Sequence, residues 1–243
     1  MSDQPAAASP ASPAGVPTVA VWDLPVRLFH WTLVTLIVLA WVSRKYGDAN
    51  LVWHTWNGYA ILVLIAWRLI WGFTGSSTAR FRSFFYWPWT AATYGIDFAL
   101  RRPRHFLGHN PLGGAVVFLM LGLIGLQGVL GLFSYDDHDS NAGGPLASKV
   151  ADATWAAATK WHITIFDLIL IVAILHIVAN VLYFVWKREN LVKAMITGHK
   201  PARPDYEDGR EAVLAGAGRA LLALIAAVVI VFGGIMTFGG KVL

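Results

Sequence analysis

The stretch WHITIFDLILIVAILHIVANVLYFVW, residues 161–186, decides the fold of this chain. Its only acidic residue is Asp167, and it contains two histidines, His162 and His176. A helix needs about 20 apolar residues to cross a hydrocarbon core of about 30 Å. The stretch therefore predicts a membrane-spanning helix that carries histidines inside the bilayer.

Four further stretches are long and apolar enough to span a membrane, at about 26–42, 54–73, 112–133 and 212–238. The whole chain is 56% hydrophobic and 14% charged, whereas soluble domains carry about 25% charged residues. We predict an all-α integral membrane fold, with four helices in residues 21–200 and a linker plus a fifth spanning helix in 201–243. Residues 1–20, rich in Ala, Pro and Ser, are expected to form a disordered tail.

The chain has no cysteine and a net charge of +5. The absence of cysteine excludes disulfides, iron–sulfur clusters, thiolate zinc sites and haem attached through CxxCH. In a membrane protein the positive excess reports topology, so no nucleic-acid partner is expected. Any cofactor must be held by nitrogen, oxygen or methionine sulfur.

Charged residues in the loops predict the orientation. Basic residues gather in two loops: Arg80, Arg82, Arg101, Arg102 and Arg104 after the second span, and Lys187, Arg188, Lys193, Lys200 and Arg203 after the fourth. The loop between the third and fourth spans instead carries Asp136, Asp137, Asp139 and Asp152. By the positive-inside rule the N-terminus is cytoplasmic, and after five crossings the C-terminus lies outside the cytoplasm. Arg44 and Lys45 are exceptions, because they follow the first span, at the end that this assignment places outside.

Two smaller elements are expected outside the spans. Residues 89–100 predict an amphipathic helix at the membrane interface. In the acidic loop, a polar turn at 141–145 is followed by an Ala-rich piece that we expect to form a short separate helix.

Four of the eight histidines fall inside or at the edges of the spans: His30, His54, His162 and His176. Ionisable groups are costly inside a membrane and usually functional. His162 and His176 are fourteen residues apart, which is about 21 Å along a helix and about 40° short of whole turns. Depth then predicts two pairs, His54 with His162 on the outer side and His30 with His176 on the inner side.

Each histidine pair is suited to a haem. A haem iron takes two axial imidazole nitrogens, whereas a bare metal ion needs more ligands than two histidines. We therefore predict two haems, held by His30–His176 and His54–His162. The alternative, histidines that only bond neighbouring helices, is the weaker explanation for four residues at matched depths.

Arg68 lies fourteen residues after His54 and so at the depth of the inner pair. Its guanidinium either pairs with a haem propionate or extends to the cytoplasmic interface. Gly122, Gly125, Gly128 and Gly131 of the third span allow close approach of a macrocycle or, more simply, of another helix. Of the remaining histidines, His105 and His109 either line a quinone pocket or are solvated, and His138 and His199 are expected to be exposed.

Four motifs resemble the bacterial cytochrome b561 family, which includes the b-type cytochrome subunits of nickel–iron hydrogenases. They are VWDLPVRLFHW at 21–31, HTWNGYAILVLIAWRLIWGFTG at 54–75, RPRHFLGHNPLGG at 102–114 and WHITIFDLILIVAILHIVANVLY at 161–183. The resemblance covers residues 20 to 200. It implies a four-helix bundle with two b haems on the four histidines, and electron exchange with quinone and a periplasmic hydrogenase or c-type cytochrome. The fifth span lies outside it.

We therefore expect an electron-transfer protein that links the quinone pool to a periplasmic redox partner, with the acidic loop as a docking surface for a basic partner. One alternative is a quinone-linked oxidoreductase acting on a small molecule such as superoxide. An anionic substrate would favour a basic outer surface, and the outer loop is acidic. A second alternative is a non-redox transporter or anchor.

Overall fold

The computed structural model of this chain describes residues 17–46, 51–102, 104–136, 142–209 and 211–242. In this part, five helices are long and apolar enough to cross a membrane. They are α1 (Leu24–Tyr46), α2 (Val52–Thr74), α4 (Pro111–Phe133), α5 (Asp152–Lys187) and α7 (Ala217–Thr237). The predicted all-α membrane bundle is confirmed.

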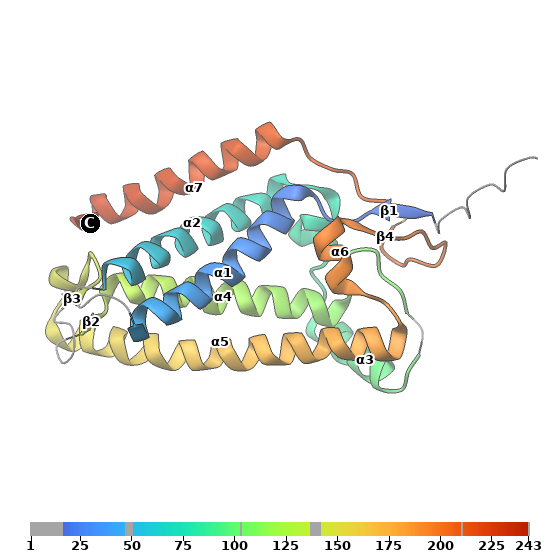
Figure 1. The fold of residues 1–243 in the computed structure, drawn as a ribbon, viewed down its shortest axis with the longest axis horizontal. Coiled ribbons are helices and arrows are strands. Elements are labelled where there is room, and N and C mark those ends of the chain that lie inside the picture. The colour runs from blue at the N-terminus through green and yellow to red at the C-terminus, as the bar shows by residue number, and fades with distance from the viewer. Residues whose placement is uncertain (1–16, 47–50, 103, 137–141, 210, 243) are drawn as a thin grey trace, which may run out of the picture.

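The helices α1, α2, α4 and α5 form the bundle, and α7 lies along α2 on its outer side (Figure 1). The closest helix pairs are α4 with α5, α1 with α2, α2 with α7 and α2 with α4. Apolar side chains of α1, α2, α4 and α5, among them Leu33, Ile65, Ile124 and Ile169, make the core of the bundle. Trp67 of α2 donates its indole N–H to the carbonyl oxygen of Ala220 in α7 at 3.1 Å.

Short elements close the two ends of the bundle. At one end lie α3 (Pro88–Ala99), α6 (Leu191–Thr197) and an antiparallel pair of strands, β1 (Thr18–Ala20) and β4 (His199–Pro201). At the other end β2 (Tyr135–Asp136) pairs with β3 (Ala142–Gly143). Three 3-10 turns complete the described part: η1 (Ser77–Ala79), η2 (Phe81–Ser83) and η3 (Ala147–Lys149).

Local sequence explains where the helices begin. Asp23 caps α1, because its Oδ1 accepts the backbone N–H of Val26 at 2.7 Å and satisfies an otherwise unpaired amide. Asn110 caps α4 in the same way through Gly113 at 2.8 Å, and proline follows it at the first helical position. Pro88 likewise opens α3, which matches the predicted interfacial helix closely.

Three predicted boundaries were wrong. Thr18–Ala20, expected in the disordered tail, form β1, because β4 supplies a hydrogen-bonding partner far along the chain. The Ala-rich piece before residue 161 is the start of α5 and not a separate helix, since no glycine or proline interrupts it and alanine favours helix. The fifth span begins at residue 217 instead of 212, because Val213 and Ala215 donate their amides to Ser77 and Ser76.

Candidate functional site

His54 of α2 and His162 of α5 face each other inside the bundle. Their ring centroids are 6.1 Å apart and their planes are inclined by 81°. Both side chains are partly buried. The structure thus brings together the two residues that depth alone had paired on the outer side.

Backbone carbonyls of the other two bundle helices fix both rings. The Nδ1 of His54 lies 2.8 Å from the carbonyl oxygen of Ala40 in α1. The Nδ1 of His162 lies 2.9 Å from that of Gln127 in α4. Because a carbonyl only accepts, each Nδ1 carries the proton and donates it, which leaves the Nε2 lone pair available. Metal-binding histidines have this arrangement, since the second bond sets tautomer and orientation.

Gly131 of α4 makes room for the ring of His162. A Cβ at Gly131 would lie 3.0 Å from Cε1 of His162, which is closer than the ring could accept without moving. Gly128 has a different role, because its Cβ would meet Leu62 of α2 at 2.6 Å. Nothing lies within 4 Å of a Cβ at Gly122. Gly128 thus fits the predicted helix packing, and Gly131 gives room to the His162 ring, while the predicted approach of a macrocycle stays a prediction.

The spacing of the outer pair fits an iron atom between the rings. Two metal–nitrogen bonds of about 2 Å and two ring radii of about 1 Å span about 6 Å, and the centroids are 6.1 Å apart. Among the described residues there is no cluster of three or more histidine, cysteine or carboxylate side chains that could hold a bare metal ion. A haem needs only the two axial nitrogens, because its macrocycle supplies the other ligands.

The rings of the second predicted pair, His30 and His176, have fewer hydrogen bonds to neighbouring helices than those of His54 and His162. His30 of α1 and His176 of α5 are close enough to influence each other electrostatically. The Nδ1 of His30 is buried and has no hydrogen-bond partner among the described residues. His176 is exposed, and its Nε2 lies 3.2 Å from the amide nitrogen of Asn180 one turn further along α5. Neither inner ring is fixed by a backbone carbonyl of another helix within the described part of the chain.

Arg68 is buried among the side chains of the bundle. The residue is 3% exposed, and its guanidinium lies 5.1 Å from the ring of Phe81 and 5.9 Å from the ring of Phe84. The carboxylate of Asp23 acts on Arg68 electrostatically, but its two oxygens already accept hydrogen bonds from Val26 and Trp71. One terminal nitrogen of Arg68 is buried without a partner in the described structure. A buried cation is costly unless an anion joins it, so this site fits a carboxylate such as a haem propionate.

His109 is partly buried and its Nδ1 is shielded from solvent, so of the two predicted alternatives, lining a quinone pocket or being solvated, the structure does not show the solvated one. Its ring packs between Trp22 at 4.7 Å and Phe84 at 4.5 Å. Burial, with smaller effects of Arg68, Lys200 and His176, lowers the pKa of His109 to about 3. His109 is therefore neutral at physiological pH, and its buried Nδ1 has no partner among the described residues. The sequence showed a basic loop here, and only the fold places this ring beside Arg68.

The remaining histidines differ in exposure. His105 is mostly buried, 3.9 Å from carboxylate oxygens of both Glu189 and Asp205, and burial lowers its pKa. His199 is exposed, as predicted. His138 lies outside the described residues, as do Asp137 and Asp139 of the acidic loop.

Asp136 of the acidic loop pairs with Arg44 at 3.1 Å. Arg44 was one of the two cations that ran against the predicted orientation. Its partner is acidic, so the end of α1 and the acidic loop belong to one end of the bundle. The Arg-rich segment around α3 lies at the opposite end (Figure 1).

Comparisons with known protein families and with individual relatives point to the same family of membrane cytochromes. The sequence profile of the prokaryotic cytochrome b561 family matches residues 21–198. A probable Ni/Fe-hydrogenase B-type cytochrome subunit of Azotobacter vinelandii is 24% identical over 78% of this chain and 91% of its own length. Proteins of the same description from Bradyrhizobium diazoefficiens and Rhodobacter capsulatus are 25% and 26% identical, over 78% and 77% of this chain and 88% and 83% of their own lengths. No solved structure matches the chain.

Proposed function

Because this chain belongs to the prokaryotic cytochrome b561 family, we propose that it holds two b haems and carries electrons between membrane quinone and a redox partner outside the cytoplasm. The geometry of His54 and His162 is the main support for this proposal. His54 and His162 stand at the spacing of two axial ligands, with both Nδ1 atoms donating to carbonyls. This is the role of an electron-transfer subunit and not of a stand-alone enzyme.

The four histidines supply the axial nitrogens in this proposal. Bound b haem provides a one-electron carrier whose potential depends on its axial ligands, burial and nearby charge. His54 and His162 hold the outer group, and His30 and His176 hold the inner one. Because His162 and His176 are about 21 Å apart along α5, groups held by these residues would lie in different halves of the bilayer.

Arg68 would act on the inner group. Its buried guanidinium offers donors to a propionate, and a charge-assisted, two-pronged bond would fix the orientation of the macrocycle. The positive charge also favours the reduced form, because reduction adds one negative charge to the haem.

The proposed orientation puts the N-terminus in the cytoplasm and the C-terminus in the periplasm of a bacterium with this protein in its inner membrane. The Arg-rich segment supports it through the positive-inside rule. The Arg44–Asp136 pair supports it as well, because it offsets a cation that otherwise counts for the opposite orientation.

For the outer partner we propose a nickel–iron hydrogenase, on the strength of the names of the relatives. A c-type cytochrome is the second candidate. The acidic loop, with Asp136, Asp137 and Asp139, would dock a basic surface. Quinone would exchange electrons at the inner end, where the neutral ring of His109 offers a polar atom between Trp22 and Phe84.

A visible spectrum and a haem assay test the proposal. The purified protein should contain two haems per chain and show a sharp α band on reduction by a quinol. A colourless protein, or one haem per chain, would overturn it. Neutralising Asp136, Asp137 and Asp139 to Asn should slow electron exchange with the partner at low salt and remove its salt dependence. Unchanged rates would rule out the docking surface while leaving haem binding intact.

A further inference from the structure

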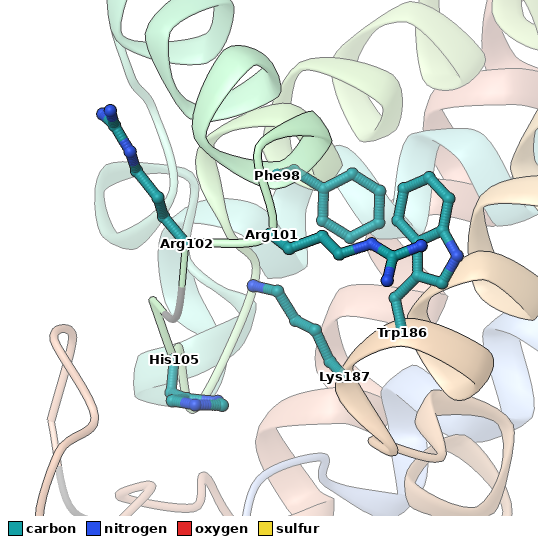
Figure 2. Close-up of a pocket in the computed structure, with 6 residues that line it drawn as sticks. All are labelled: Phe98, Arg101, Arg102, His105, Trp186 and Lys187. Atoms are coloured by element: carbon teal, nitrogen blue, oxygen red, sulfur yellow. The ribbon is translucent and has the colours of Figure 1, made fainter.

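A pocket of about 200 Å³ lies where α3 and α5 end, apart from the histidine pairs. Figure 2 shows the side chains around it, from the end of α3, the segment that follows it and the end of α5. The lining residues are Phe98, Arg101, Arg102, His105, Trp186 and Lys187. Four of these six residues are basic or can become so.

Two cations lie on an aromatic wall in this pocket. Phe98 and Trp186 pack with ring centroids 5.3 Å apart. The guanidinium of Arg101 lies 5.3 Å from the Trp186 ring, and Nζ of Lys187 lies 5.6 Å from the Phe98 ring. The side chain of Arg102 points away from this wall (Figure 2). The aromatic rings hold the two cations in place without neutralising them.

The carboxylates of Asp97 and Glu189, close to the pocket in the sequence, form ion pairs with cations other than Arg101 and Lys187. Asp97 pairs with Arg102 at 3.1 Å and with Arg104 at 3.4 Å. Glu189 pairs with the buried Lys200 at 2.7 Å. Within the described residues, Arg101 and Lys187 form no ion pair with a carboxylate. Nζ of Lys187 donates to the hydroxyl of Tyr94 at 3.1 Å and to the carbonyl oxygen of Arg104 at 2.8 Å, which leaves one of its three N–H groups for a ligand. The pocket therefore has the guanidinium of Arg101 and one N–H of Lys187 to offer to an oxyanion.

Arg101 holds its position in a strained backbone. Its φ is +56°, in the left-handed region that usually takes glycine. The amide of Arg101 donates to Phe98 at 3.0 Å, and that of Arg102 donates to Asp97 at 2.9 Å, so this turn ends α3. The turn directs the Arg101 side chain back over the end of α5.

The surroundings of the pocket are those of a membrane interface. Trp186 lies at the end of a spanning helix, where indole rings prefer the headgroup region. On α3 and just beyond it, Trp89, Ile96 and Leu100 are all more than half exposed. An apolar face beside cations that form no ion pair in the described structure fits a molecule with a negatively charged head and apolar chains.

We propose that this pocket binds the phosphate of an anionic phospholipid headgroup. Arg101 and Lys187 hold the phosphate oxygens, and the apolar face of α3 lies along the acyl chains. A free phosphate ion offers the same oxyanion but no chains, so it should bind much more weakly. The proposal is independent of the haem assignment.

The test uses the full-length protein in detergent and native mass spectrometry. Phosphatidylglycerol with short acyl chains is titrated, with phosphatidylcholine of the same chains and inorganic phosphate as comparisons. The first variant is Arg101→Gly, which removes the cation and suits the left-handed turn, so it should fold at least as well as the parent. The second adds Lys187→Gln. The control is Arg82→Gln, an exposed arginine of the same segment that does not line the pocket.

Wild type and Arg82→Gln should retain phosphatidylglycerol in preference to phosphatidylcholine. Arg101→Gly should weaken that binding about fivefold, and the double variant further, since each cation contributes separately to binding an anionic lipid. The helical circular dichroism signal should stay unchanged in all variants, which verifies the fold. Equal binding by Arg101→Gly and Arg82→Gln would overturn the proposal. So would equal retention of the two lipids, or displacement of the lipid by an equal concentration of inorganic phosphate.

Discussion

His54 and His162 face each other at 6.1 Å between ring centroids, and each is tied by Nδ1 to a carbonyl of a further helix. All four bundle helices thus contribute to the outer pair, although only two of them carry its histidines. Rings that are oriented beforehand lose little freedom when they bind. The outer site is therefore expected to bind haem more tightly than the inner one, whose rings lack such anchors.

Replacing either outer histidine should remove one haem of two. We expect His54→Ala and His162→Ala to lose about half of the haem, because an iron with one protein ligand is poorly retained. The remaining α band should be that of the inner group. A pyridine haemochrome assay per chain measures the loss, with His199→Ala, an exposed histidine, as control. Full haem content in both outer variants would contradict the pairing.

Gly131 offers a test of the clearance around His162. Gly131→Val should displace the ring, since even its Cβ would lie 3.0 Å from Cε1, and the outer haem content should fall. Gly122→Val introduces the same side chain in the same helix, where nothing lies within 4 Å of the added Cβ. It should therefore keep both haems. Equal haem content in the two variants would show that Gly131 has no role in ligand placement.

Arg68→Gln should lower the reduction potential of the inner haem. The charge removed stabilises the reduced form, and the loss of a charge interaction of about 1–2 kcal/mol corresponds to roughly 40–90 mV. Redox titration of the α band measures the shift. Arg68→Lys keeps the charge and should shift less, and Arg82→Gln should not shift at all. A potential unchanged by Arg68→Gln would place the propionates elsewhere.

His109 predicts a loss of stability in acid. Its pKa is about 3 in the folded protein against an ordinary value of 6.5. The unfolded chain therefore takes up the proton first as the pH falls. Stability is unaffected above about pH 6.5 and falls between pH 6.5 and 3, by about 2 kcal/mol at pH 5.

Thermal unfolding in detergent at pH 7.5 and pH 5 tests this effect. The His109→Gln variant keeps a polar side chain of similar size and should lose less stability on acidification than the parent. The His199→Gln variant, changed at an exposed position, should behave like the parent. If all three proteins lost stability equally, another group would be responsible.

Much of this protein follows from its sequence alone. Apolar length predicts the five spans, because a bilayer imposes the same thickness on every crossing helix. Helical rise and turn place His162 and His176 on nearly one face at two depths. Boundaries were less accurate where partners lie far along the chain, as for β1 and β4 or for Ser76 and Ala215.

Only the tertiary structure decided how the site is held. The carbonyls of Ala40 and Gln127 bond the rings of His54 and His162 because of where α1 and α4 pack, and the sequence cannot single them out, since every residue type has a backbone carbonyl. Likewise, the burial of Arg68 and His109 depends on Phe84 and Trp22, which are far from one another along the chain. Periodicity and depth are properties of one helix, so the sequence reveals them. Burial and hydrogen-bond partners are properties of packed helices, so they appear only when the chain is folded.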